Sequence, residues 1–167
     1  MKMFRKFLGV VLCVCLIGIC SLFASAQDAE IMIVLSDSGI TVDGSEISQN
    51  GADAVYVSEK TETHADVSED LKDVQNTVIT ITQAGTYRLS GTMSDTQIAV
   101  AAGENDAVNI ILDNVNITCR TAPALMIYSA YEPSVPGEAG VTLTLAENSV
   151  NELTGSHTAA TEDDPIK

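Results

Sequence analysis

The stretch TVITITQAGTYRLSGTMSDTQIAV, residues 77–100, decides the fold prediction. Apolar residues alternate here with small polar ones; the alternation breaks off at Ala84-Gly85, resumes, breaks off at Ser90 to Thr96 and resumes at Ile98. A period of two residues is typical of a β-strand that buries one face. The stretch therefore predicts three short strands, with corners at the two interruptions.

Similar runs recur later in the chain. VITITQAGTYRL begins at Val78, VNIILDNVNI at Val108 and VTLTLAENSVNEL at Val141, at spacings of 30 and 33 residues. Such a repeat is typical of a coil whose turns stack on one another, because no single turn can bury its apolar face alone. We therefore predict an all-β fold, a parallel β-helix. A β-sandwich or jelly roll is the alternative, since it also contains many short strands.

Residues 1–26 have the pattern of a signal peptide. Lys2, Arg5 and Lys6 precede an apolar run of about 15 residues, shorter than the roughly 20 of a membrane-spanning helix, and Ala24-Ser25-Ala26 supplies small residues for cleavage before residue 27. We expect a protein that is secreted, extracellular or on the cell surface, without stable membrane insertion after cleavage. Cleavage leaves Cys119 as the one cysteine, and we expect it to be a small buried side chain.

The rest of the chain divides into three parts. We expect residues 27–57 to form N-terminal strands that cap the fold. We expect residues 77–167 to form the coils of the β-helix. Residues 58–76 hold many charges and little to bury, so they predict an acidic loop; the spacing of Val67, Leu71 and Val74 leaves a short helix open.

The mature chain is strongly acidic. All 23 acidic residues but only five of the eight basic ones follow residue 26, which leaves a formal net charge of −18. Nucleic acid and anionic lipid are disfavoured as partners on this balance. One explanation of the negative charge is that it keeps the protein soluble. The other is that it serves to bind Ca²⁺, which prefers oxygen ligands.

The order of motifs after residue 77 resembles a known family. Gly85-Thr86-Tyr87, Leu89-Ser90-Gly91, Leu112-Asp113-Asn114-Val115 and Asn151-Glu152-Leu153-Thr154 follow one another as in the secreted carbohydrate-binding β-helix family of clostridia and related Firmicutes. The resemblance implies a right-handed, pectate-lyase-like parallel β-helix that binds calcium and cellulose or acidic plant polysaccharide. Members of that family continue for further coils, so the resemblance implies an N-terminal fragment, incomplete at its C-terminal end.

Oxygen-bearing side chains gather at two predicted corners. Asp113, Asn114 and Asn116 surround one corner, and Glu147 occupies the comparable place in the next unit. We list these four residues as candidate Ca²⁺ ligands. Asn and Asp also favour such corners because they tolerate left-handed backbone and bond their own backbone, which leaves a purely structural role open.

The candidate carbohydrate contacts are the side chains of one arginine and two tyrosines. Arg88 lies between inward-facing Tyr87 and Leu89, so it is expected to point outward; Tyr128 and Tyr131 are expected to be exposed. The resemblance implies non-catalytic binding of extracellular polysaccharide, assisted by calcium and directed to acidic plant cell-wall glycans. A Ca²⁺-dependent polysaccharide lyase and a surface adhesin or structural stalk are the alternatives.

Overall fold

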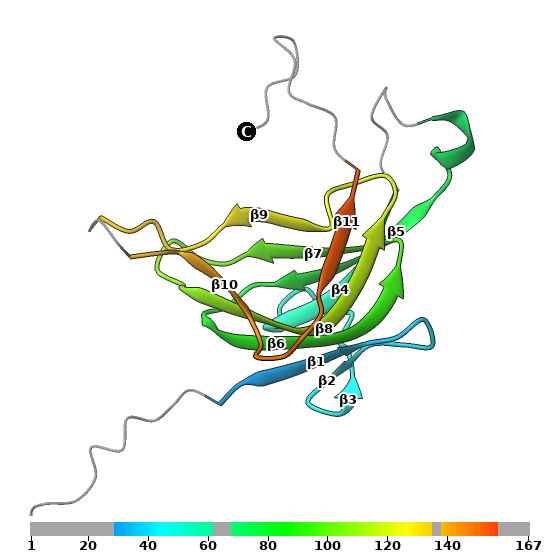
Figure 1. The fold of residues 1–167 in the computed structure, drawn as a ribbon. Coiled ribbons are helices and arrows are strands. Elements are labelled where there is room, and N and C mark those ends of the chain that lie inside the picture. The colour runs from blue at the N-terminus through cyan, green and yellow to red at the C-terminus, as the bar shows by residue number, and fades with distance from the viewer. Residues whose placement is uncertain (1–28, 62–67, 135–137, 157–167) are drawn as a thin grey trace, which may run out of the picture.

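The computed structural model describes residues 29–61, 68–134 and 138–156, and Figure 1 shows their arrangement. These residues form strands and one 3-10 turn, η1 (Glu69–Leu71), which confirms the all-β class. The strands are β1 (Ile31–Leu35), β2 (Thr41–Val42), β3 (Ser45–Glu46), β4 (Val55–Thr61), β5 (Gln75–Ile81), β6 (Gly85–Ser94), β7 (Thr96–Ala101), β8 (Val108–Cys119), β9 (Leu125–Ser129), β10 (Val141–Leu145) and β11 (Glu152–Gly155). The predicted signal peptide at residues 1–26 lies outside the described residues. No helix in the described ranges is long and apolar enough to cross a membrane.

The strands form two sheets. The first has the order β10-β8-β6-β1-β2-β3, with β11 paired to the second half of β8, and the second has the order β4-β5-β7-β9. From β5 to β10 the chain passes to the other sheet at every connection, and the strands of this part pair in parallel within each sheet. β2, β3 and β4 pair antiparallel, so both sheets are mixed.

The core lies between the two sheets, where inward-facing side chains stack in rows across the strands. Leu89 lies opposite Leu112 in the first sheet, and Ile81 lies opposite Val100 in the second. All four are at most 2% exposed and belong to one apolar cluster that draws on both sheets. The predicted burial of Tyr87 is confirmed, and its hydroxyl donates to the Gln83 carbonyl at 2.8 Å. Cys119 is buried, also as predicted.

The register shows that the predicted alignment of the repeat is partly wrong. Val108 lies opposite Val141, 33 residues later, as the spacing predicts. Val78, however, belongs to the second sheet and lies opposite Gln97, whereas the residue opposite Val108 in β6 is Gly85. The runs resemble one another because strands of both sheets alternate apolar and small polar residues. Equivalent positions are therefore 23 residues apart from Gly85 to Val108 and 33 from there to Val141.

The corner predicted at Ser90 to Thr96 is confirmed only at Asp95, where the chain passes from β6 to β7. β6 continues through Ser90 and Gly91, and its register with β8 shifts between Leu89 and Gly91. Asp113 and Asn114 of β8 together face Ser90, so β8 carries one extra residue, as in a β-bulge. Asn114 has a φ of 58°, and the strand bends at this point instead of ending.

The N-terminal strands extend both sheets. β1 pairs in parallel with β6, and a turn at Asp43-Gly44 joins β2 to β3 with positive φ at both residues. β4 continues to Thr61, into the segment predicted as an acidic loop or short helix. As an edge strand, β4 can carry charged residues, which is why composition alone indicates a loop there.

Candidate functional site

The outer surface of the first sheet carries mostly neutral polar side chains, together with the acid Glu152, and the row Arg88, Ile111, Thr144 interrupts them. They project from alternate positions of β6, β8, β10 and β11, whose intervening positions face the core. We call this surface the polar face; its residues are Thr86, Thr92, Ser94, Asn109, Asn116, Thr118, Thr142, Glu152 and Thr154.

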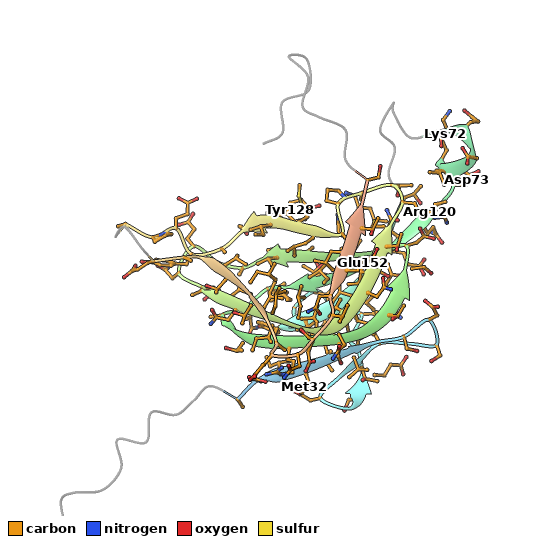
Figure 2. All side chains as sticks on the ribbon, viewed as in Figure 1. Met32, Lys72, Asp73, Arg120, Tyr128 and Glu152 are labelled. Atoms are coloured by element: carbon orange, nitrogen blue, oxygen red, sulfur yellow. The ribbon has the colours of Figure 1, made fainter. Side chains whose placement is uncertain are left out.

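Parallel pairing places these side chains in rows that cross the strands. One row runs Thr86, Asn109, Thr142, and another runs Thr92, Asn116, Glu152. Neighbouring strands are about 4.8 Å apart, so each row presents hydroxyl and amide groups at a short, regular interval. Figure 2 shows Glu152 on β11, where the second row ends. Such a surface can donate and accept several neutral hydrogen bonds along an extended ligand.

The bend of β8 is fixed by asparagine side chains. Asn114 Oδ1 accepts a hydrogen bond from the backbone N–H of Val150 at 3.2 Å, and Asn151 Oδ1 accepts one from the N–H of Val115 at 2.9 Å. Asn114 Nδ2 donates to Asp113 Oδ1 at 2.9 Å. These amides therefore link β8 to the connection between β10 and β11. The asparagines of this corner thus have the structural role that the sequence analysis gave as the alternative to calcium binding.

The four candidate calcium ligands do not form a ready set of free oxygens. Asp113 Oδ2 accepts from the Arg88 guanidinium at 3.2 Å, and a cation at that distance opposes a second cation. Asn116 and Glu147 are exposed. In the part of the chain that the structure describes, no three His, Cys, Asp or Glu side chains are grouped so that they could hold a metal ion. The corner as described does not fit a calcium ion without rearrangement.

Arg88 points outward as predicted, but two carboxylates hold its guanidinium. Nε and Nη2 donate to the Glu30 carboxylate at 2.7 and 3.2 Å, and Nη1 donates to Asp113. The Arg88 hydrogen bond lowers the pKa of Glu30 below its ordinary value of 4.5. Arg88 thus ties the residue before β1 to the bend of β8, which is a structural task.

We predict that the ion pair between Arg88 and Glu30 stabilises the fold at neutral pH and loses this effect in acid. The lowered pKa of Glu30 means that its contribution is fully present above pH 4.5, its unfolded value, and is lost as pH falls through the folded value. An Arg88→Met variant should therefore be less stable than the wild type at pH 7. The difference in urea midpoint should shrink as pH falls below 4.5, and a constant difference would show that Arg88 acts through packing alone.

The two candidate tyrosines lie in a different part of the molecule. Tyr128 is 55% exposed on β9, at the border of the second sheet (Figure 2). Tyr131 is half-buried, and its hydroxyl donates to Glu138 Oε2 at 2.7 Å, which raises the pKa of Tyr131. Tyr128 is thus free to stack on a sugar ring, but Arg88 lies on the first sheet, so the structure does not unite the three predicted contacts in one site.

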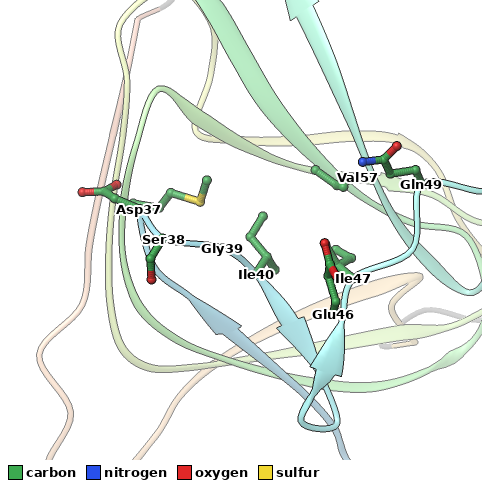
Figure 3. A pocket seen from close by; sticks show the side chains of 9 residues that line it. Asp37, Ser38, Gly39, Ile40, Glu46, Ile47, Gln49 and Val57 are labelled. Carbon is green, nitrogen blue, oxygen red and sulfur yellow. The ribbon is translucent and has the colours of Figure 1, made fainter.

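A pocket lies near the N-terminal strands (Figure 3). Its volume is about 270 Å³, below the roughly 300 Å³ at which ligand pockets usually begin. It is lined by Asp37, Ser38, Gly39, Ile40, Glu46, Ile47, Gln49, Val57 and Met93. An extended ligand is better accommodated by the open polar face.

Most of the polar face is missing from the sequence-based candidates. Asn116 is the one shared residue, and it was assigned to calcium. Thr92 and Asn109 look like ordinary strand residues in the sequence. The signal that could have found them is the correct register, because only then do Thr86, Asn109 and Thr142 fall in one row.

An all-β scaffold with an open polar surface is suited to binding an extended ligand. The model of a carbohydrate-binding domain-containing protein family matches residues 75–166, more than half of the chain. The chain belongs to this family, which confirms the predicted carbohydrate-binding class. Every residue of the polar face lies within the match, whereas β1 to β4 lie outside it. Neither a curated protein nor a solved structure matches the chain.

Proposed function

We propose that the chain is a non-catalytic, extracellular module that binds polysaccharide along the polar face. The observation that carries the proposal is the coincidence of two findings: rows of exposed hydroxyl and amide groups, and a carbohydrate-binding family match that contains all of them. Sugar hydroxyls both donate and accept hydrogen bonds, and Thr and Asn side chains do the same. A regular sheet surface positions such groups rigidly, which lowers the entropic cost of binding.

The proposed scaffold is a right-handed, pectate-lyase-like parallel β-helix. Alternation of β5 to β10 between two sheets, with parallel pairing inside each, supports a coil. A β-sandwich joined by hairpins would pair its neighbours antiparallel.

We further propose that calcium is required only for an acidic glycan. The formal net charge of −18 after residue 26 repels a polyuronate. Among the described cations, Arg88 and Arg120 are paired with carboxylates, as is Lys72 with Glu69. A divalent ion held jointly by exposed carboxylates of the protein and by the uronates would offset this repulsion without a preformed site at the bend of β8, whereas a neutral glycan needs no such ion.

Affinity electrophoresis tests these proposals. The purified chain is run in native gels that contain hydroxyethylcellulose or polygalacturonate, with calcium or with EDTA. We expect retardation in at least one polymer, with EDTA abolishing it only for polygalacturonate. Absence of retardation in both would favour an adhesin or stalk, and ultraviolet absorbance from an unsaturated product would favour a lyase. Retardation by polygalacturonate that EDTA leaves unchanged would overturn the calcium bridge.

The location of binding is tested by a paired substitution. We predict that Asn109→Ala combined with Asn116→Ala weakens polysaccharide binding about tenfold, because each lost neutral hydrogen bond is worth about 0.5–1.5 kcal/mol. Asn105→Ala is the matched control, since Asn105 is exposed on the connection between β7 and β8 and lies off the polar face. Equal weakening in both variants would place the ligand elsewhere.

A further inference from the structure

The polar face repeats across its strands but not along them. In the row Thr86, Asn109, Thr142 each strand presents a neutral side chain that can donate and accept hydrogen bonds. The outward positions of β8 instead read amide, apolar, acid, amide and hydroxyl, from Asn109 to Thr118. A polysaccharide is a chain of similar units, so it matches the direction in which the surface presents similar groups.

The spacing of the side chains favours the same direction. Neighbouring strands of a sheet lie about 4.8 Å apart, which is close to the length of one sugar in an extended 1,4-linked chain. Successive outward side chains along one strand are instead about 6.6 Å apart, the length of two residues. A glycan that crosses the strands therefore sets one sugar above each strand, and each sugar meets an equivalent side chain.

The bend of β8 also opposes a ligand that follows the strand. The register between β6 and β8 shifts between Leu89 and Gly91, and Asn114 has a φ of 58°. Figure 1 shows β8 as a curved strand. A straight glycan laid along β8 would not keep its contacts on both sides of the bend, whereas a row across the strands lies wholly on one side of it.

A neighbouring row supplies an apolar contact. Arg88, Ile111 and Thr144 face outward on β6, β8 and β10, and Ile111 is half-buried. Met32 on β1, 37% exposed, continues this row opposite Arg88 (Figure 2). A pyranose ring has an apolar face of C–H groups and a rim of hydroxyls. The ring can therefore lie on Ile111 while its hydroxyls reach Asn109, two positions away on the same strand.

We infer that the polysaccharide crosses β6, β8 and β10 along the row Thr86, Asn109, Thr142, with Ile111 as the apolar contact beneath a sugar ring. The inference rests on the proposed function and adds the direction of the ligand and a residue that selects for an extended chain. A glycan that coils, such as an α-1,4-linked glucan, turns its sugars away from a straight row. The rows beyond the bend have the same direction, so a polymer can also cross there, at Asn116.

A spin label tests the direction. The probe is the tetrasaccharide of whichever polymer retards the chain in the gels, cellotetraose or tetragalacturonate, with a nitroxide at its reducing end. Its effect is read as broadening of the backbone amide signals of the full chain. We expect the strongest broadening on β1, β10 or β11, the strands that flank β6 and β8. Strongest broadening at an end of β8, beside Val108 or Cys119, would show that the glycan follows the strand and would overturn the inference.

A substitution tests the apolar contact. We expect Ile111→Asn to weaken tetrasaccharide binding about fivefold, because a sugar ring on Ile111 removes some tens of Å² of apolar surface from water. Val150→Asn is the matched control: Val150 is 81% exposed on the connection between β10 and β11, so the dissociation constant should not change. Equal effects of the two substitutions, or equal binding of maltotetraose, would overturn the role of Ile111. The spin-label measurement uses the wild-type chain and does not depend on the folding of either variant.

Failure of the inference is distinguishable from failure of the proposed function. Absence of retardation by every polymer contradicts the proposed function itself. Retardation by a polymer whose tetrasaccharide does not bind contradicts the inference alone, because four sugars are enough to cover the row on β6, β8 and β10.

Discussion

A Gly91→Ala variant is expected to lose about 3–5 kcal/mol of unfolding free energy, which is the range of strongly destabilising substitutions. A Cβ atom at Gly91 would lie 2.1 Å from the backbone oxygen of Leu35, its partner in β1, and this contact cannot be relieved by rotating a side chain. The backbone φ of Gly91 is also 102°, which residues with a Cβ rarely adopt. Both causes act at the junction of β1 and β6, so β1 should separate from the sheet.

Urea denaturation measures the loss, and amide hydrogen exchange locates it. We expect protection to fall first along β1, because the clash is with Leu35. Gly44→Ala is the matched control: its φ is 77°, but an added Cβ would meet nothing within 4 Å. It should cost only the strain of left-handed backbone, about 1–2 kcal/mol. Similar losses in the two variants would contradict the steric argument.

The sequence predicted the strands well because a period of two residues is a local property. The runs that begin at Val108 and Val141 are both strands, and so is the run that resumes at Ile98. The predicted start of the next corner, at Ser90, is wrong for a local reason as well. A glycine inside a strand that approaches a neighbouring backbone looks, in sequence, the same as a glycine that ends a strand.

The register could not be read from the sequence, and the candidate site depends on it. Val78 and Val108 begin similar runs, yet they belong to different sheets, because inward-facing apolar residues alternate with small ones in both. The pairing is decided by which strands close around one core, a property of the whole chain. Arg88 illustrates the consequence. Its outward direction follows from its neighbours in sequence, but its contacts with Glu30 and Asp113 bridge residues 58 and 25 positions away.

A Leu112→Ala variant is expected to lose about 2–5 kcal/mol, whereas Leu145→Ala should lose under 1 kcal/mol in dilute solution. The two leucines lie opposite each other in β8 and β10, in one row of inward-facing side chains, so the same atoms are removed from equivalent positions. Leu112 is 2% exposed between two neighbouring strands, and its truncation leaves a cavity. Leu145 is 64% exposed, so the monomer loses little packing when it is shortened.

Urea denaturation at pH 7 measures both losses, and circular dichroism confirms that each variant folds before the titration. If Leu145→Ala is as unstable as Leu112→Ala, the last row of the core is covered within the chain itself.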